Sequence, residues 1–245
     1  MTSLAFDHLS HDRGGHSWSQ LHAAAIDRSF FTHTLDLECP SAPVDNPLKR
    51  LVDMVIAAAL LALLSPLLLV VAIAVRLDGG PALFGHRRIG VSGDIFRCWK
   101  FRTMVCNANE VLARLLETDA EARAEWQRDF KLRHDPRVTR IGRFLRGTSL
   151  DELPQLFNVL LGHMSLVGPR PIVADEIGRY GAAFHDYARC RPGITGVWQV
   201  SGRNHVDYRE RVRLDQDYAR HWSLAHDCRI LLKTPVAVLK KDGAY

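Results

Sequence analysis

The hydrophobic residues of this chain gather in one long run, and no charged residue occurs between Met54 and Val75, a stretch of 22 positions. At 1.5 Å per residue, a helix of that length covers about 33 Å, which is enough to cross the hydrocarbon core of a bilayer. Ser65 and Pro66 interrupt the run at its middle. A proline inside a helix removes one backbone hydrogen bond and kinks the axis, while a neighbouring serine hydroxyl can bond the carbonyl that is left free. The pattern predicts a membrane helix that either spans the bilayer or bends at Pro66 and returns to its own side.

Charges on the two sides of the run favour the bent form. Residues 1–48 carry a net charge of −4, and residues 49–245 carry a net charge of +9. Because cations collect on the cytoplasmic side of a membrane, we expect the large C-terminal part to lie there, beside anionic head groups. Cations flank both ends of the run: Lys49, Arg50, Arg76, Arg87 and Arg88. Two cationic ends suit a re-entrant hairpin better than a spanning helix, although they do not decide between the two.

Composition divides the chain into three parts. Residues 1–48 are polar and hold five of the twelve histidines, and we expect a mostly disordered tail. We expect residues 49–78 to form the membrane helix, whether spanning or re-entrant, and residues 79–245 to form a cytoplasmic domain. The five cysteines lack any CxxC spacing, which argues against a disulfide framework or a zinc site and for a reducing compartment. A calculated pI near 9.1 favours an anionic partner, whether membrane, nucleic acid or a phosphate-rich substrate.

The third part is expected to combine a small hairpin with helices. Two short apolar and aromatic runs, at 82–84 and 95–104, flank a glycine-rich link and predict two strands. The cations Arg97, Lys100 and Arg102 recur at near-alternate positions of the second run, where they face either solvent or a phosphate or lipid group. Residues 107–133 keep helical spacing and predict a helix that packs on the domain.

Residues 137–146 interleave apolar and basic side chains in the manner of a helix that lies on an anionic membrane surface. The apolar members are Val138, Ile141, Phe144 and Leu145, and the basic members are Arg137, Arg140, Arg143 and Arg146. The same pattern suits a nucleic-acid-binding face. Residues 230–241 are apolar with three lysines and predict a second surface helix. The expected fold class is therefore α+β, mainly α, with a membrane helix, amphipathic surface helices and a small β-hairpin; that the membrane helix is re-entrant follows from the family resemblance given below.

Two adjacent carboxylates, Asp151 and Glu152, precede the next predicted helix. Pro154 has no amide hydrogen and is tolerated in the first turn of a helix, so that helix is expected to begin at about Asp151 or Glu152. An aspartate there can cap free amides, and Ser149 with Glu152 has the spacing of a capping box. In a strongly basic neighbourhood the same pair would stay ionised, and one carboxylate could attack phosphorus while the other binds Mg²⁺. The residues alone leave both roles open.

One arginine follows the carboxylate pair in a stiff loop. Arg170 stands between two prolines in Gly168-Pro169-Arg170-Pro171, and a guanidinium held in this way suits bidentate phosphate recognition. Lys100, Arg102 and Arg146 are further candidates for binding phosphate.

The chain resembles the bacterial polyprenyl-phosphate phosphoglycosyl transferases, the monotopic sugar transferases that begin exopolysaccharide, capsule and glycan assembly. The resemblance rests on motifs in the family's order: KR before an apolar segment broken by SP, then KFRTM, SLDELPQLFNVLLGHMSLVGPRP, RPGITGVWQVSGRN, a D-x-x-Y from Asp215 to Tyr218, and DCRILLKT. It covers Lys49 to about Thr234, and the run from DELPQ to PRP is highly specific. GHRRIG, from Gly85 to Gly90, departs from the glutamine-containing version that is more usual. Larger members have further N-terminal membrane helices, so we expect this chain to correspond to the minimal catalytic unit.

The resemblance implies that residues 79–245 transfer a sugar-1-phosphate from a UDP-sugar to polyprenyl (undecaprenyl) phosphate. Asp151 would attack the β-phosphate and release UMP, leaving an aspartyl-phosphosugar that polyprenyl phosphate then attacks. Glu152 would hold Mg²⁺, Arg170 would bind phosphate, and Asp215 is a further substrate-binding candidate. The family's apolar segment is a re-entrant helix bent at Ser-Pro, and the catalytic domain is expected on the cytoplasmic face of the bacterial inner membrane.

A membrane-tethered basic binding module without catalysis is the alternative function. It explains the pI, the cations and the apolar run, but it leaves the Asp151-Glu152 pair and Arg170 between its prolines without a purpose. We therefore expect UDP-sugar, polyprenyl phosphate and membrane lipids as partners and no nucleic acid. The sequence identifies neither the sugar, for which we expect a glucose- or galactose-type hexose, nor the oligomeric state.

Overall fold

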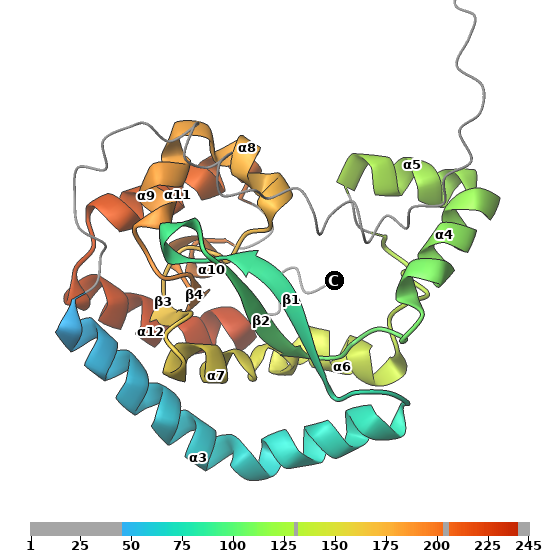
Figure 1. The fold of residues 1–245 in the computed structure, drawn as a ribbon, viewed down its shortest axis with the longest axis horizontal. Helices are drawn as coiled ribbons and strands as arrows, with labels where there is room; N and C mark the ends of the chain where they lie inside the picture. The colour runs from blue at the N-terminus through green and yellow to red at the C-terminus, as the bar shows by residue number, and fades with distance from the viewer. Residues whose placement is uncertain (1–45, 130–131, 203–205, 240–245) are drawn as a thin grey trace, which may run out of the picture. The chain divides into compact units, whose positions relative to one another are not determined.

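The computed structural model describes residues 46–129, 132–202 and 206–239 (Figure 1). Of the expected tail, only residues 46–48 belong to the described part, where they open the first helix, so the prediction of disorder for the remainder lies outside the described residues. The described part is mainly helical, with a small antiparallel two-stranded sheet and one long apolar helix. This confirms the expected α+β, mainly α class.

The long apolar helix, α3 (Pro47–Leu77), has 31 residues and begins two residues before the predicted membrane segment. Asn46 caps its start, because the Asn46 side chain accepts hydrogen bonds from the backbone N–H groups of Leu48 and Lys49. Pro47 occupies the first turn, where a missing amide hydrogen has no cost. Asp78 and two glycines with positive φ, Gly79 and Gly80, end the helix.

The axis of α3 changes direction about midway along the helix (Figure 1), and Pro66 lies inside it. Pro66 cannot donate to the carbonyl of Ala62, four residues earlier. The Ser65 hydroxyl donates to that carbonyl instead, at 2.8 Å. The predicted kink and the compensating hydrogen bond of serine are both present, so the two halves of the helix meet at an angle.

Most of the apolar side chains of α3 are exposed. Only 11% of its most apolar 18-residue window is buried inside the protein, and Leu63, Leu69 and Val70 are 74%, 62% and 62% exposed. A core helix of a soluble protein would be mostly buried, so the length, composition and exposure of α3 together suit a membrane helix. Whether it spans the bilayer or re-enters its own side stays a prediction.

Each half of α3 also seats on the rest of the described chain. In the first half, Ala57 is fully buried in the larger core cluster, which includes Leu156 and Val159. In the second half, Val71 and Val75 pack in a second cluster, which includes Phe101 and Leu145. Both halves are therefore held against the same domain.

Two of the flanking cations turn inward instead of facing head groups. Lys49 is only 8% exposed. Arg50 donates to the carbonyls of Val159 and Leu160 at 2.6 and 3.0 Å. These two of the cations that flank the apolar run are thus engaged by acceptors of the domain.

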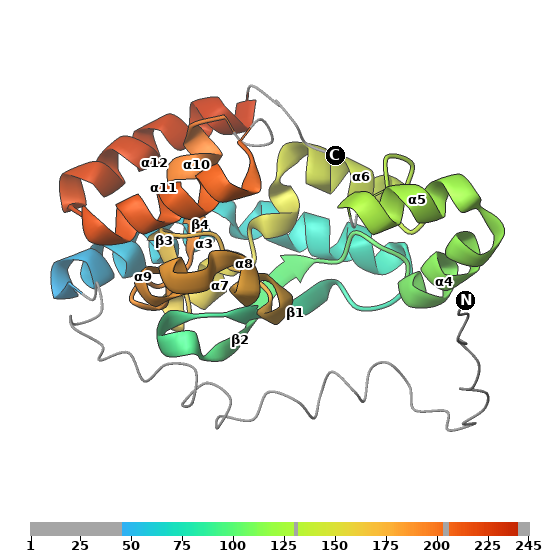
Figure 2. The same ribbon diagram turned by 90° about the horizontal axis from the view of Figure 1, so that it is seen from above.

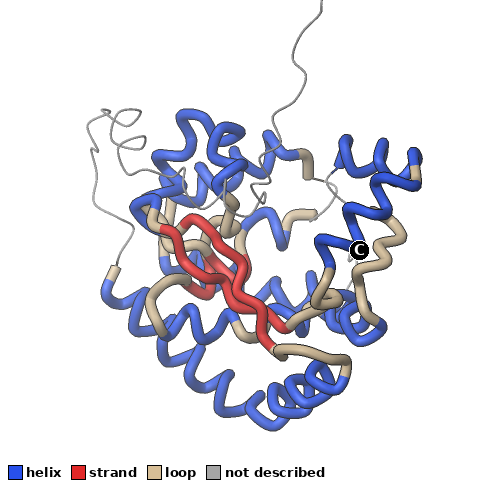
Figure 3. Tube along the Cα trace, turned by 45° about the vertical axis from the view of Figure 1, so that its right-hand side comes forward, coloured by secondary structure: helices blue, strands red, loops and turns tan. Residues whose placement is uncertain are grey.

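The predicted hairpin is present and is the longer pair of strands in Figure 3. β1 (Leu83–Ile89) pairs antiparallel with β2 (Ile95–Phe101), in register from Leu83 opposite Phe101 to Ile89 opposite Ile95. The connection contains the single turn η1 (Val91–Gly93), in which Gly93 has a positive φ. The first strand runs well beyond the predicted residues 82–84.

The predicted helical stretch 107–133 is two helices, α4 (Ala108–Thr118) and α5 (Ala120–Asp129). Asp119 divides them, since its carboxylate accepts from the backbone N–H groups of Glu121 and Ala122 and so caps α5. α6 (Arg140–Thr148) corresponds to the predicted amphipathic segment and is capped by the Thr139 hydroxyl.

The remainder of the domain contains short elements and two longer helices. β3 (Ser165–Val167) pairs parallel with β4 (Gly193–Thr195), a contact that the sequence did not predict. Between them lie η3 (Ala174–Glu176), α8 (Ile177–Tyr180), η4 (Gly181–Ala183) and α9 (Phe184–Ala188). After β4 come α10 (Val197–Val200), α11 (Tyr208–Arg220) and α12 (Leu224–Leu239), and α10 packs against both α11 and α12 (Figure 2).

Candidate active site

A residue in the left-handed conformation separates α6 from the turn that carries the carboxylate pair. α6 ends at Thr148, and Ser149 adopts a left-handed conformation with φ 57°. The 3₁₀ turn η2 (Leu150–Glu152) then carries Asp151 and Glu152, and α7 (Gln155–Leu160) starts three residues after Glu152. The expected helix start at Asp151 or Glu152 is therefore wrong. The capping box is also absent, because an N-cap needs extended backbone and the left-handed Ser149 makes no side-chain cap bond.

Lys100 of β2 pairs with Glu152. Lys100 Nζ lies 2.5 Å from Glu152 Oε1, and the two side chains are 29% and 39% exposed. Asn158 of α7, which is fully buried, fixes the strand for this contact. Its amide donates to the Arg97 carbonyl at 2.7 Å, and its oxygen accepts from the Trp99 N–H at 2.9 Å. Lys100 is thereby held over the turn that carries the carboxylates.

The two carboxylates have different pKa values. Burial, reinforced by the neighbouring charge of Glu152, raises the pKa of Asp151 to about 6, against the opposing effects of Lys100 and Arg146. Burial also acts to raise the pKa of Glu152, but the Lys100 ion pair and the charges of Arg170 and Arg88 outweigh it and hold that pKa below its ordinary value. Glu152 is thus a stable anion at neutral pH, whereas the pKa of Asp151 lies about one unit below neutral pH.

Arg146, in the last turn of α6, belongs to the same electrostatic neighbourhood. Its Nε donates to the Thr103 hydroxyl at 2.9 Å. Burial lowers the pKa of Arg146, and the charge of Asp151 opposes that change. The predicted cation is therefore close enough to Asp151 for the two charges to interact.

Arg102, another predicted phosphate ligand, has a structural position. It is 7% exposed, and its guanidinium donates to three backbone carbonyls. These are the carbonyls of Pro81 at 2.9 Å, Met104 at 3.0 Å and Val75 at 2.7 Å. Arg102 thus satisfies a free carbonyl near the end of α3 and carbonyls of the segments that follow. These contacts account for the presence of a buried arginine without any bound phosphate, and they place Arg102 outside the candidate site.

Arg170 lies on a loop whose backbone is fixed by close contact with the segment around β4. The Gly168 N–H donates to the Thr195 carbonyl at 3.0 Å, and the Gly193 N–H donates to the Pro169 carbonyl at 2.8 Å. A Cβ atom at Gly168, Gly193 or Gly196 would overlap the backbone of the facing segment. Arg170 itself stacks on Trp198, with the guanidinium carbon 5.5 Å from the ring centroid.

Asp215, predicted to bind substrate, lies behind this loop. It is 1% exposed, accepts from the Tyr180 hydroxyl at 2.8 Å and accepts from the backbone N–H of Arg170. Burial raises the pKa of Asp215 to about 7, although Tyr180, Arg170 and Arg211 act to lower it. The buried side chain contacts the loop backbone, so we correct its expected role from substrate binding to support of Arg170.

Three residues of this arrangement were not singled out from the sequence. Arg88 donates to the Pro171 carbonyl at 3.2 Å and contributes to the low pKa of Glu152. Trp198 supports Arg170, and Asn158 holds β2. A signal existed for Asn158, because it is the one polar residue in an apolar run from Leu156 to Leu161.

The carboxylates fit a magnesium ion only together with a phosphate. Among the described residues, no group of three or more His, Cys, Asp or Glu side chains is placed to hold a metal ion. Mg²⁺ often binds through one or two carboxylates and the oxygens of substrate phosphates. Asp151 and Glu152 offer those carboxylates, beside cations that suit a phosphate.

Residues 44–241 match the sequence model of a family described as bacterial sugar transferase. The undecaprenyl-phosphate galactose phosphotransferase of Salmonella typhimurium is 56% identical over 198 residues, which are 81% of this chain and 42% of that protein. The exopolysaccharide production protein ExoY of Rhizobium meliloti is 48% identical over 204 residues, 83% of this chain and 90% of ExoY. The UDP-glucose:undecaprenyl-phosphate glucose-1-phosphate transferase of Escherichia coli is 38% identical over 217 residues, 85% of this chain and 44% of that protein. The chain thus spans less than half of several of these relatives.

Proposed function

The chain belongs to the bacterial sugar transferase family, and on that premise we propose that it transfers a sugar-1-phosphate from a UDP-sugar to undecaprenyl phosphate and releases UMP. The names of the Salmonella and Escherichia relatives describe this type of transfer for those proteins. The observation that carries the proposal here is the turn η2, where Asp151 adjoins Glu152 within a group of cations. A phosphate bound there would meet a nucleophile and the charges that neutralise it.

The proposed reaction has two displacements at one phosphorus atom. In the first, an oxygen of ionised Asp151 bonds to the β-phosphorus of the UDP-sugar, the bond to the bridging oxygen breaks, and UMP leaves. In the second, a phosphate oxygen of undecaprenyl phosphate attacks the same phosphorus. The bond to Asp151 breaks, the carboxylate is restored, and undecaprenyl-diphosphate-sugar forms.

Each charged side chain of the site has a proposed part in this reaction. Glu152 would hold Mg²⁺, which when bound neutralises charge on the diphosphate. Arg170 and Lys100 would bind phosphate oxygens, since both charges already act on Glu152. Arg146 stabilises Asp151 as an anion. The requirement for Mg²⁺ is part of this proposal and is tested together with it.

The test of the proposed function is UMP release from a panel of UDP-sugars, in nanodiscs that contain undecaprenyl phosphate, with Mg²⁺ and with a chelator. We expect one donor to yield UMP and a lipid-linked sugar in equal amounts, and the chelator to stop both. Binding of an anionic partner without UMP release from any donor would instead support a basic binding module.

We further propose that α3 re-enters the cytoplasmic face of the bacterial inner membrane. The bend at Pro66 and the exposed apolar side chains of both halves support this arrangement. Two other helices carry exposed apolar residues suited to the same surface: Phe144 on α6, and Leu232 and Val236 on α12, at 60%, 79% and 54% exposed. On α6, Phe144 adjoins the exposed cations Arg140 and Arg143, as expected of a helix that lies on anionic lipid.

Single cysteines at Gln20 and Asp217 are expected to report the same side of the membrane. With a membrane-impermeant thiol reagent, both should stay unlabelled in intact cells and both should react after permeabilisation, with the parent protein giving the background of its own cysteines. Replacing Pro66 with leucine restores a backbone donor and should increase the share of molecules whose residue 20 is labelled from outside. Labelling of position 20 in intact cells without that replacement would mean that α3 spans the membrane.

A further inference from the structure

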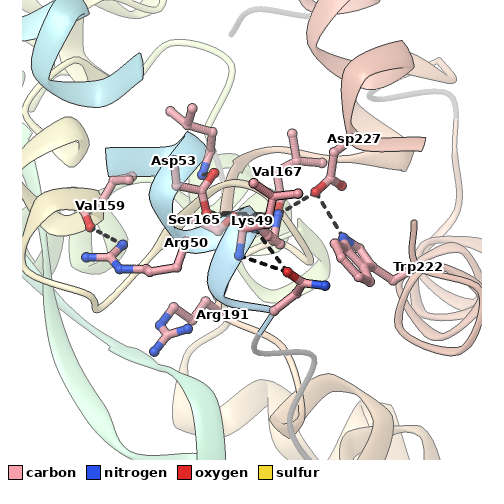
Figure 4. A network of polar contacts seen from close by, with 12 residues as sticks. Lys49, Arg50, Asp53, Val159, Ser165, Val167, Arg191, Trp222 and Asp227 are labelled. Carbon is pink, nitrogen blue, oxygen red and sulfur yellow. Dashed lines mark hydrogen bonds and ion pairs between the residues drawn. The ribbon is translucent and has the colours of Figure 1, made fainter. Parts of the chain in front are cut away.

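The first turn of α3 is joined to the domain by a buried lysine. Lys49 Nζ lies 2.6 Å from Asp227 Oδ2 on α12 and donates to the Val167 carbonyl at 3.0 Å (Figure 4). The side chains of Lys49 and Asp227 are 10% and 5% exposed. A charge that is buried in this way needs specific partners: Lys49 has the Asp227 carboxylate and the Val167 carbonyl, and the Asp53 carboxylate forms a longer ion pair with it at 4.0 Å.

One turn further along α3, Asp53 holds the same strand. Its carboxylate accepts from the Ser165 hydroxyl at 2.7 Å and from the Leu166 N–H at 3.2 Å. Lys49 and Asp53 therefore reach all three residues of β3 between them, and the start of the membrane helix fixes this strand from one side (Figure 4).

The donors around Asp227 explain why a lysine is needed. The Tyr218 hydroxyl lies 2.8 Å from Asp227 Oδ1 and 2.9 Å from the Val167 carbonyl, but it has one proton and cannot donate to both at once. The Trp222 Nε1–H donates only to Asp227. Lys49 carries three N–H groups, so it supplies the remaining donor to Val167 and the positive charge opposite Asp227.

Val167 is the residue immediately before Gly168, where the loop that carries Arg170 begins. From there on the loop is held by backbone contacts with the β4 segment and by Asp215 at the Arg170 N–H. The carbonyl that Lys49 holds is thus three residues from the arginine. The hydroxyls of Tyr218 and Ser165 also lie within hydrogen-bond distance of it, at 2.9 Å each, but each has one proton, for which a carboxylate competes: Asp227 at Tyr218 and Asp53 at Ser165.

We propose that Lys49 is a positioning residue for the phosphate site: by holding the Val167 carbonyl against Asp227, it sets the loop of Arg170 in the place where the donor diphosphate binds. A displacement of the first turn of the membrane helix would then also displace Arg170. This inference rests on the proposed function for its kinetic test, and its structural test is independent of turnover.

The decisive comparison is between Lys49→Met and Arg50→Met in nanodiscs. Both variants lose one cation at the same end of α3, but Arg50 donates to the carbonyls of Val159 and Leu160 at the end of α7, which do not belong to the loop of Arg170. We expect Lys49→Met to raise the KM for the UDP-sugar about tenfold, since a displaced binding group can cost up to about 100-fold in rate. Arg50→Met should keep the KM of the wild type. Equal KM values in the two variants would overturn the proposal.

Combination with Arg170→Lys separates positioning from general stability. If Lys49 acts through Arg170, the double variant Lys49→Met/Arg170→Lys should have a donor KM no higher than that of the weaker-binding single variant. A purely structural role of Lys49 would make the two effects multiply, and that result would contradict the inference.

Lys49→Met leaves the two buried carboxylates of Asp227 and Asp53 without their shared cation, and this can prevent folding. The variant Lys49→Met/Asp53→Asn/Asp227→Asn removes both charges. The amide oxygens that replace the carboxylates can still accept from Trp222 and from the Leu166 N–H. We expect this variant to recover the melting temperature of the wild type while the raised donor KM persists. Recovery of both would show that only the buried charge mattered, against the proposal.

Hydrogen–deuterium exchange tests the placement of the loop without any substrate. In Lys49→Met the backbone amides of 166–172 should exchange faster than in the wild type, whereas in Arg50→Met they should not. Faster exchange in an enzyme that never releases UMP would refute the proposed function and leave the contact of Lys49 with the loop standing. Unchanged exchange in Lys49→Met would refute the role of Lys49, whatever the activity.

Discussion

Asp151→Asn is expected to abolish both UMP release and formation of the lipid-linked sugar, with a loss of about 10⁴-fold or more, the range seen when a catalytic nucleophile is removed. The asparagine keeps the size of the side chain but lacks the anionic oxygen that bonds to phosphorus. The environment of Asp151 supports this choice, because its pKa of about 6 leaves most of the carboxyl ionised at neutral pH, and a neighbour with a lower pKa remains available for metal. The fold should survive, since asparagine removes the repulsion between two adjacent carboxylates.

Asp217→Asn is the matched control, because it makes the same change at an exposed position of α11. It should keep full activity. With a donor labelled in the sugar and without undecaprenyl phosphate, the wild type should retain label on the protein, the label should be released by hydroxylamine, and Asp151→Asn should carry none. A wild type that turns over normally yet never holds the label would refute the covalent route.

Arg170→Lys is expected to lower kcat/KM for the UDP-sugar by about 100-fold, in the range found when one donor to a developing charge is lost. Lysine keeps the charge but lacks the planar fork that can bind two phosphate oxygens at once, and it stacks less well on Trp198. The expected loss therefore measures geometry, since the net charge of the site does not change.

Arg179→Lys controls for the loss of a stacked guanidinium. Arg179 lies over Tyr208, with its guanidinium carbon 5.1 Å from the ring centroid, in a contact of the same kind as that of Arg170. It should retain the kinetics of the wild type in the UMP assay. If both variants lose activity to the same degree, stacking on aromatic rings is the common cause and phosphate binding by Arg170 is excluded as the explanation.

The parts of the fold that sequence reasoning predicted are those set by local chemistry. The bend of α3 follows from a proline that cannot donate and a serine that can, and neither needs a distant partner. The hairpin likewise follows from two apolar runs around glycine-rich turns. The predicted start of α7 is wrong, because the backbone conformation of one residue, Ser149, differs from the one expected. The left-handed Ser149 moves the start of α7 beyond the carboxylates, and nothing in the residue type of serine signals that conformation.

The role of Lys49 could not be predicted either, because charge counting identified it only as one of the cations that flank the apolar run. Its partner Asp227 is 178 positions away in the chain, so no local pattern reveals that the cation is neutralised inside the protein. Arg102 was misjudged for a related reason, because its acceptors are backbone carbonyls, which every sequence contains. Asp151, Glu152 and Arg170 were identified by motif and resemblance, whereas their spatial relation to Lys100 depends on the buried amide of Asn158.

The contact among Gly168, Gly193 and Gly196 limits how this protein can be re-engineered for another sugar. A methyl group at any of these positions would overlap backbone atoms of the facing segment, so even alanine would displace the loop of Arg170 instead of reshaping a subsite. A library built to change donor specificity should keep the three glycines constant, together with Trp198 and Asp215, which contact Arg170, and randomise other side chains of α10 and α11. Otherwise most of its members would lose the phosphate contact, and a screen would discard substitutions that accept the new sugar.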